Sequence, residues 1–463
     1  MNSVQIQRNR WQAKRRYYAT QLISPFVRFA RMQTVGGILL LVFSAIAVMC
    51  ANIPALSWVH KFWETDLSMT FNFNANFLPL RTVGEWVNDA LMAIFFFTVG
   101  LEIKREMVAG ELSSIRNALL PIFAAAGGMA APALIYFGIN SCMEGGATNG
   151  FGIPTATDIA FTIGVLSLLG KRVPIALKVF LTALAIVDDL GAILVLAIFY
   201  PTHALHFDFL LGAVGILAIL VVLNSLRINR TYPYIFLGLI LWFLTLRSGI
   251  HATVAGVALA MTIPSSIKIN QIRFYVRSKY MVERFREAYN HNPSMPLLKS
   301  EMEQQQINNL ANEIRKVTPL ILRLEHSLQP WITFCIMPIF ALANAGVVVS
   351  AESFKLLTHP VALGIFFGLL FGKPIGITLL SWLTIKLKLA AMPNKTRWIE
   401  MIGAGMLAGI GFTMAIFVDT IAFNTAEVAH LQNVGKLAIL MTSTCAAIFG
   451  LIYMKLVTKK VLV

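Results

Sequence analysis

The sequence predicts an all-α protein that crosses a membrane many times. Of its 463 residues, 57% are hydrophobic and 13% are charged, whereas a typical soluble chain has about a quarter charged residues. The mean hydropathy is +0.71. Twelve stretches are apolar enough to form spans, each of which needs about 20 residues. We therefore expect a polytopic bundle of twelve transmembrane helices.

The predicted spans are separated by short polar connections, with one long exception. They cover residues 33–52, 88–107, 118–139, 155–169, 175–200, 208–225, 232–246, 250–264, 331–348, 360–384, 399–422 and 434–454. We do not expect the first to be a cleaved signal peptide, because it is long and follows 32 mostly polar residues. The chain then divides into a basic tail (1–32), helices 1–8 (33–264), a connection (265–330), helices 9–12 (331–455) and a second tail (456–463).

The basic residues alternate between the two sides of the predicted bundle. Counted by connection, with Lys178, Lys373 and Lys436 set aside, 31 Lys and Arg fall on one side and 4 on the other. The positive-inside rule places the richer side, with both termini, in the cytoplasm. This distribution explains the net charge of +16 without nucleic acid as a partner. The four cysteines are scattered, and their spacing predicts neither disulfides nor a zinc site.

Two connections have a periodic pattern. Residues 70–77 alternate between polar and apolar side chains, which favours a short external β-hairpin. In the connection 265–330, apolar residues recur every three or four positions from Ile307 to Leu328, which predicts amphipathic helix. Thr318 and Pro319 are typical of an N-cap and a first helical residue, so we expect a break into two helices there.

Asp188 and Asp189 are adjacent within a strongly apolar span. A charge at the centre of a bilayer costs about 2.5–3.5 kcal/mol, so two in succession indicate function. Carboxylates this close in a dry site need a cation or a proton between them. The pair therefore predicts a site that holds either cations or protons.

Two spans are interrupted, and a third contains a lysine. The fourth span has Gly, Pro and Thr residues before Asp158, and the eleventh has four glycines between Gly403 and Gly411. Paired interruptions in the two halves of a transporter indicate its binding site. Lys373 lies too deep in the tenth span to reach water easily. We expect Asp158, Asp188, Asp189 and Lys373 to form one cluster, whose oxygen ligands suit Na⁺ or Li⁺.

The residues up to this point leave several classes open. A sodium-coupled solute symporter is the main alternative to an ion exchanger, because a solute cavity has no sequence signature. A channel is a poorer fit, because a titratable cluster conducts slowly. An intramembrane aspartyl protease is disfavoured, since its aspartates lie on different helices in a GxGD context that is absent here.

The chain resembles the NhaA family of bacterial sodium/proton antiporters. The matching stretches follow in order along residues 30–455, at 88–92, 99–106, 154–161, 185–192, 248–253, 324–326, 343–346, 371–374 and 409–413. The resemblance implies an inverted-repeat fold in which two interrupted helices cross at mid-membrane. It also implies electrogenic, pH-regulated exchange of two protons for each Na⁺ or Li⁺ in the cell inner membrane. No cofactor and no enzymatic activity are implied.

The resemblance also implies roles for individual residues. Asp189 is expected to be the principal cation ligand, with Thr157 beside the ion. Asp188 is expected to exchange protons and to pair with Lys373 when sodium is absent. Asp158 and Lys373 are expected to compensate the dipoles of the broken helices. The expected pH-response residues are Glu102, Arg105, Glu325, His326 and His251.

Assembly and three departures complete the comparison. The resemblance implies a homodimer that contacts through residues 70–77. The connection 265–330 is longer than is usual in the family, and Gln329 stands where a second histidine is expected. Asp419 has no implied role, and we expect it to lie in a wetted external funnel.

Overall fold

The structure, a computed structural model, describes most of the chain. It covers residues 33–67, 82–201, 205–266, 271–291, 300–348, 356–394, 396–424 and 428–458. Within these ranges the protein is helical, and its only β-pairing is an isolated bridge between Asp66 and Thr82. The hairpin predicted at 70–77 lies outside the described residues.

Eight helices in the described ranges are long and apolar enough to cross a membrane. They are α2 (Gln33–Asn52), α4 to α5 (Val83–Ala109), α6 (Ile115–Cys142), α8 (Ile175–Phe199), α9 (Phe207–Ser225), α14 to α15 (Leu320–Asn344), α17 to α18 (Pro360–Lys386) and α21 (Leu431–Val457). The all-α polytopic fold class is therefore confirmed.

Two bent pairs of helices are also apolar enough, and the number of candidate spans is ten if each pair is counted as one span. The pair η4 (Thr148–Thr155) and α7 (Ile159–Leu168) bends by 41°, and the pair α19 (Trp398–Ala408) and α20 (Phe412–Ala422) bends by 47°. These are the two spans whose glycine, proline and threonine content predicted an interruption.

The remaining two predicted spans fall on helices that are not among these ten. Residues 232–246 lie in α10 (Thr231–Ser248), and residues 250–264 contain α11 (Ala252–Thr262). The 11 residues of α11 extend over about 16 Å, which is about half the hydrocarbon core of a bilayer. The number of transmembrane helices therefore stays a prediction.

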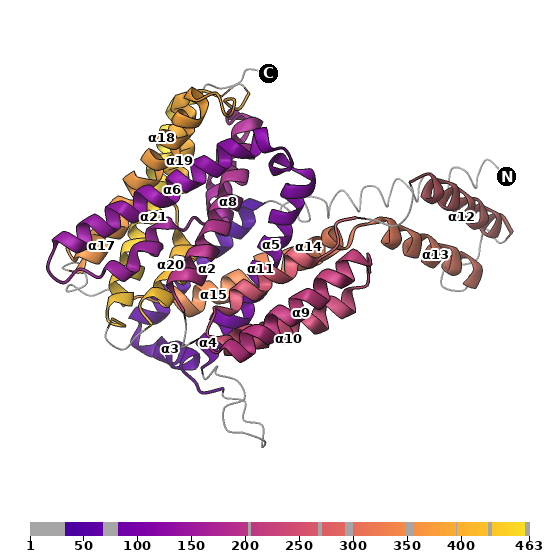
Figure 1. Cartoon of the computed structure of the whole chain (residues 1–463), viewed down its shortest axis with the longest axis horizontal. Helices are drawn as coiled ribbons and strands as arrows, with labels where there is room; N and C mark the ends of the chain where they lie inside the picture. Colours follow the sequence, from indigo (N-terminus) through magenta and orange to yellow (C-terminus); the bar gives the residue numbers. More distant parts are fainter. Residues whose placement is uncertain are drawn as a thin grey trace. The chain divides into compact units, whose positions relative to one another are not determined.

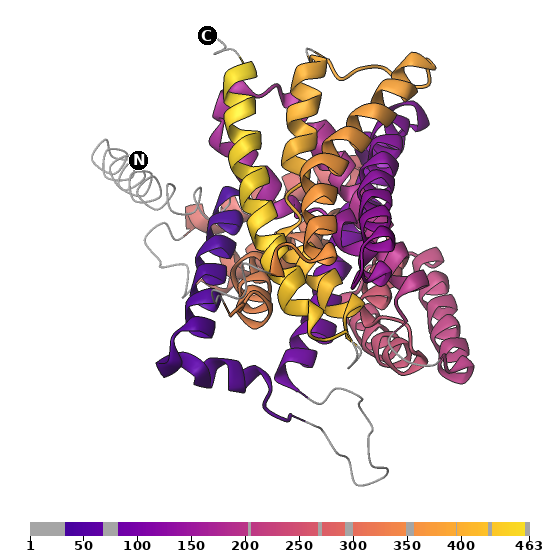
Figure 2. The ribbon, with the colours of Figure 1, turned by 90° about the vertical axis from the view of Figure 1, so that its left-hand side faces the viewer.

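The chain forms two compact units that alternate along the sequence. Figure 1 labels their helices on a ribbon coloured from the N-terminus (indigo) to the C-terminus (yellow). Unit 1 comprises residues 1–61, 119–192 and 337–463, and unit 2 comprises 62–118 and 193–336. In unit 1, α19 packs against α18 (Lys373–Lys386) and α21, and Figure 2 shows these helices side by side in orange and yellow. In unit 2, α5 (Met92–Ala109) packs against α11, and α9 packs against α10.

Glycine allows two helices of unit 1 to touch through their backbones. A Cβ atom on Gly127 of α6 would lie 2.2 Å from the carbonyl oxygen of Gly376 in α18. A Cβ on Gly376 would lie 2.0 Å from the carbonyl oxygen of Gly127. Small residues are common where membrane helices approach closely. This contact holds α18, and with it Lys373, against α6.

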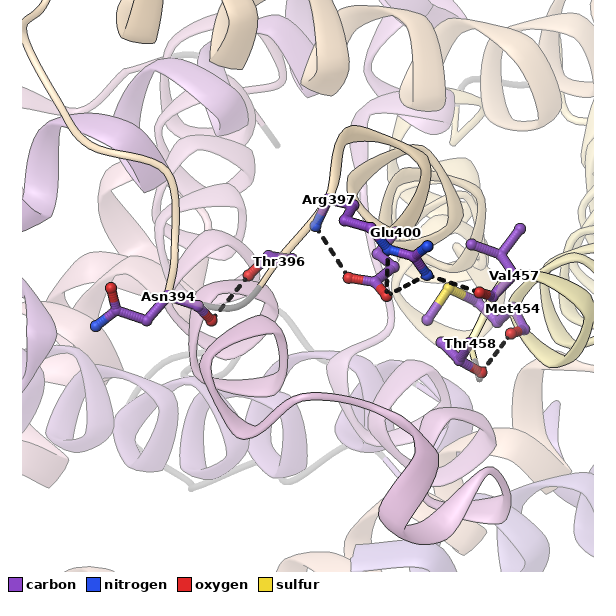
Figure 3. A network of polar contacts seen from close by, with 7 residues as sticks. All are labelled: Asn394, Thr396, Arg397, Glu400, Met454, Val457 and Thr458. Atoms are coloured by element: carbon purple, nitrogen blue, oxygen red, sulfur yellow. Dashed lines mark hydrogen bonds and ion pairs between the residues drawn. The ribbon is translucent and has the colours of Figure 1, made fainter. Parts of the chain in front are cut away.

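A polar network joins the start of α19 to the end of α21 (Figure 3). The Glu400 side chain accepts a hydrogen bond from the Arg397 backbone N–H at 3.0 Å and from its guanidinium at 2.9 Å. The same guanidinium donates to the Val457 carbonyl oxygen at 2.8 Å. The network therefore satisfies backbone groups at one end of each helix, which would otherwise lack partners.

In the long connection, α12 (Gln271–His291) packs against α13 (Glu301–Val317) (Figure 1). Glu313 accepts hydrogen bonds from Lys316 at 2.7 Å and from Arg277 of α12 at 3.5 Å. The break predicted near residue 318 is present, but its capping was assigned wrongly. Thr318 is the C-cap of α13 and Pro319 is the N-cap of α14 (Leu320–Trp331), because the helix resumes one residue later than the pattern indicated.

Candidate functional site: a buried charged cluster at two helix breaks

The two adjacent aspartates lie in the middle of α8, within unit 1. Asp188 is 1% exposed and Asp189 is 2% exposed. Consecutive helical residues point about 100° apart, so the two carboxylates face different neighbours. Asp188 faces Lys373, and its Oδ2 accepts a hydrogen bond from Nζ of that lysine.

Lys373 is fully buried and forms an ion pair with Asp188. Its Nζ also donates a hydrogen bond of 2.5 Å to Oγ1 of Thr157. The lysine opens α18 directly after a π-helical turn, η8 (Gly368–Gly372). Such turns inside α-helices are frequent at functional sites. A lysine at this depth thus gains both a counter-charge and a neutral acceptor.

Asp158 lies at the break of the first bent span, where it satisfies the N-termini of two helices. Its Oδ1 accepts from the Phe161 N–H of α7 at 2.9 Å. Its Oδ2 accepts from the hydroxyl and the N–H of Thr413, at 2.5 and 3.3 Å, in the first turn of α20. A carboxylate is stabilised at this position because helix N-termini carry partial positive charge.

The second break supplies carbonyl groups to the first. The Thr157 hydroxyl donates to the Ala408 carbonyl oxygen at 3.0 Å, and the Asp158 N–H donates to that of Ile410 at 2.8 Å. The Thr162 hydroxyl donates to the Leu407 carbonyl oxygen at 3.2 Å. Each interrupted helix therefore provides hydrogen-bond partners for backbone groups that the other leaves unpaired.

The four predicted charged residues thus lie in one unit but not in one set of contacts. Lys373 contacts Asp188 and Thr157, whereas Asp158 is held by α7 and α20. Thr157 connects the two sets, because it accepts from Lys373 and adjoins Asp158 in the chain. Sequence reasoning missed Thr413, although its place after Gly409 and Gly411 could have indicated it.

The predicted pH-response residues lie in unit 2. Arg105 of α5 forms ion pairs with Glu325 of α14 at 2.9 Å and with Glu106 at 3.1 Å. The charges of these three residues act on Glu102, which lies about one helical turn before Arg105 and Glu106 on α5. His326 is exposed and makes no hydrogen bond or ion pair with the residues that the structure describes.

His251 lies beside Asp89, which is not one of the residues in these ion pairs. It is 5% exposed, and its Nδ1 is 3.7 Å from Oδ1 of Asp89. Asp89 was not among the predicted site residues. Its position inside the second span, where carboxylates are rare, was the available signal.

The prediction that Asp419 lies in a wetted funnel is wrong. Its side chain is 0% exposed, on the face of α20 that packs against α21. A polar residue near the end of a span suggested water, but the neighbouring helix covers it completely.

The apolar helices, with two bent helix pairs, define a polytopic membrane protein, and charged side chains are buried among the helices of unit 1. The chain belongs to the Na⁺/H⁺ antiporter 1 family, whose sequence model matches residues 27–454. It is 45% identical to the Na(+)/H(+) antiporter NhaA of Oleidesulfovibrio alaskensis over 95% of both chains. It is 44% identical to the NhaA of Koribacter versatilis over 92% of this chain and 91% of the relative. It is also 44% identical to the NhaA 2 of Helicobacter hepaticus, over 92% and 94%.

Proposed function

We propose that this protein is an electrogenic antiporter that exports Na⁺ or Li⁺ in exchange for protons. The transport site comprises Asp158, Asp188, Asp189, Thr157 and Lys373. The observation that carries the proposal is the buried ion pair between Lys373 and Asp188. The ammonium group of Lys373 provides the positive charge that compensates Asp188, and a bound sodium ion would provide a second positive charge at the same site.

Sodium and protons compete for the same carboxylates in this mechanism. Without sodium, Lys373 compensates Asp188, and the other oxygen of Asp188 accepts no hydrogen bond from the described residues. Sodium binds principally to Asp189 and takes over part of the charge compensation. Carboxylate and hydroxyl oxygens are hard ligands that suit such a cation.

The cycle follows alternating access. One sodium ion from the cytoplasm displaces protons from the site, the loaded site opens outward, and sodium leaves. Protons from outside then return. Two protons move for each sodium, so the proton gradient and the membrane potential both drive the exchange.

Replacing Asp189 with Asn tests the site. The carboxamide has no negative charge, so we expect Na⁺-dependent proton flux in everted vesicles to fall by at least about 100-fold. Asp208, an exposed aspartate at the start of α9, provides the matched control, since Asp208→Asn should leave flux unchanged. Full activity of Asp189→Asn would show that the ion binds elsewhere. Flux without any organic solute separates this function from sodium-coupled symport.

The cluster in unit 2 is proposed to sense pH through Glu102, Arg105, Glu325, His326 and His251. The ion pair between Arg105 and Glu325 supports a role for that pair in particular. We expect Glu325→Gln to shift the pH profile of exchange while leaving its maximal rate within about twofold. Glu283→Gln, at an exposed glutamate of α12, is the matched control and should leave the pH profile unchanged. Equal profiles for Glu325→Gln and the parent would remove Glu325 from the sensor.

Location and assembly are proposed from charge pattern and family. The protein crosses the bacterial inner membrane twelve times with inverted repeats, has both termini in the cytoplasm, and forms a homodimer through residues 70–77. Deleting 70–77 and measuring the mass in detergent tests the dimer. Loss of the dimer with retained exchange would assign transport to the single chain.

A further inference from the structure

Asp419 is a buried carboxylate that the transport site does not use. It lies on α20, six residues after Thr413, and both of its oxygens lack hydrogen-bond partners among the described residues. Six helical residues extend over about 9 Å. Asp419 therefore lies on the same helix as Thr413, which contacts Asp158, but further toward the end of the span. An ionisable group inside a span indicates a functional site, with its partner to be identified.

The backbone of α21 makes room for this carboxylate. A Cβ atom on Gly435 would lie 1.8 Å from Oδ1 of Asp419 and 3.2 Å from Oδ2. A side chain at position 435 would therefore displace the carboxylate. The absence of a side chain there keeps Asp419 directed toward α21.

Lys436, the next residue of α21, is the charged partner. The charges of Lys436 and Asp419 act on each other, although no contact of 4.0 Å or less joins them. The other elements packed on α20, which are η4 and α15 (Met337–Asn344), contain no charged or titratable residue. Asp419 is fully buried whereas Lys436 is half-buried, so the pair extends from the interior of unit 1 toward its surface.

We infer that Asp419 and Lys436 form a second proton-exchange site, which transfers protons between the outer aqueous phase and the transport site. The ligand is the proton, delivered by water or hydronium ion. A bond to hydrogen breaks in the donor as one forms at an oxygen of Asp419. The O–H bond of Asp419 then breaks as the proton passes to water, which carries it over the remaining distance to a carboxylate of the transport site. The nearby ammonium group of Lys436 offsets the charge left on Asp419. This inference rests on the proposed antiport.

The experiment measures exchange in right-side-out vesicles while the outer pH is varied. A proton-collecting group matters most when protons are scarce, so Asp419→Asn should slow exchange about tenfold near outer pH 8 and less than about twofold near pH 6. Sodium-dependent thermal stabilisation should be unchanged, because the transport carboxylates remain. A purely structural role for Asp419 would instead slow exchange equally at both pH values, and that result would overturn the inference.

Lys436 provides an independent test if Asp419→Asn does not fold. Lys436→Gln should produce the same pH-dependent slowing, and the double variant should be no slower than the slower single variant, because the two residues act as one unit. Asp208→Asn is the control at an exposed acid. Additive effects of the two substitutions would contradict a shared site. Absence of exchange in the parent protein would refute the antiport itself, whereas parent-like pH profiles in both variants would refute only this site.

Discussion

Lys373 lies in an environment that few lysines occupy. It is fully buried, has one carboxylate and one hydroxyl as partners, and lies at the start of a helix rather than at the C-terminal end, where a helix favours cations. Replacing both members of a buried ion pair is often tolerated, whereas removing one leaves an uncompensated charge. The stability of unit 1 and the transport chemistry therefore depend on the same contact.

This coupling predicts a difference between single and double variants. Lys373→Met should lower the free energy of unfolding by about 3–5 kcal/mol, because Asp188 loses its counter-charge. Asp188→Asn combined with Lys373→Met should recover most of that stability without recovering transport. Thermal unfolding in detergent and vesicle exchange measure the two properties. A double variant as unstable as Lys373→Met would argue against a charge origin.

Glu313 gives a pH prediction for the hairpin of α12 and α13. The hydrogen bond from Lys316, with the charges of Lys316 and Arg277, lowers the pKa of Glu313 from 4.5. A lowered folded-state pKa stabilises the fold above the unfolded value, and this contribution is lost as the pH falls. We expect faster hydrogen exchange in α12 and α13 as the pH drops below about 4.5, after correction for intrinsic exchange rates. In Glu313→Gln this pH dependence should be absent.

At the residue scale, the apolar surroundings of the charged residues predicted which residues belong to the site better than they predicted which groups each residue contacts. The insertion cost of Asp188 and Lys373 predicted that they meet, and the structure brings them together across 185 positions of sequence. The insertion cost also predicted that Asp158 joins this cluster. The Asp158 side chain instead contacts two helix N-termini, because the N–H groups exposed by a broken helix can donate hydrogen bonds to a carboxylate. No local sequence pattern predicts how far α8, which contains Asp188 and Asp189, lies from the two helix breaks.

At the scale of elements, a glycine matters for helix packing only where an added side chain would collide with a neighbouring helix. Gly127 and Gly138 both lie in α6, yet a Cβ on Gly127 would meet the Gly376 backbone, whereas one on Gly138 would meet nothing within 4 Å. Gly127→Ala should therefore destabilise the protein by at least about 1–3 kcal/mol, the usual cost of overpacking.

Gly138→Ala is the matched control for this prediction. Alanine favours helix over glycine by about 1 kcal/mol in solution, so this change should be neutral or stabilising. Thermal unfolding of both variants in the same detergent measures the difference. Similar midpoints for the two variants would contradict the contact between α6 and α18.

The link between α19 and α21 in Figure 3 gives a second prediction at this scale. Arg397→Ala removes donors to Glu400 and to the Val457 carbonyl oxygen, so the ends of both helices lose partners. We expect a loss of about 1–3 kcal/mol, which is typical of unsatisfied buried polar groups. Arg116→Ala, at an exposed arginine of α6, should change the unfolding midpoint little.

At the scale of the whole molecule, the proposed orientation can be tested with native Cys142. This cysteine is free and exposed at the end of α6, which the positive-inside rule places outside the cell. A membrane-impermeant maleimide should label it in intact cells, and Cys142→Ser should remove the signal. Gln305→Cys, on an exposed position of α13, should react only in everted vesicles. The reverse pattern would invert the proposed orientation.

Hydropathy predicted where the helices are in the sequence better than it predicted which helices pack together in one compact unit. Eight predicted spans coincide with long apolar helices and two more with bent helix pairs, because a hydrophobic run long enough to cross a bilayer is a strong signal. The two compact units were not predicted, since unit 1 combines three separate stretches of sequence. Contacts such as that between Gly127 and Gly376 bring those stretches together, and no sequential division of the chain can represent them.

The hydrogen bonds between the two helix breaks have a consequence for how the sequence can change during evolution. Thr157, Asp158 and Thr162 serve backbone or hydroxyl groups of the other break, so a change at one break leaves a group of the other without its partner in a medium that offers no substitute. Substitutions there should be tolerated only in matched pairs. Across relatives, the identity at position 158 should vary together with that at position 413, because these two side chains contact each other, and more strongly than positions joined along one continuous helix.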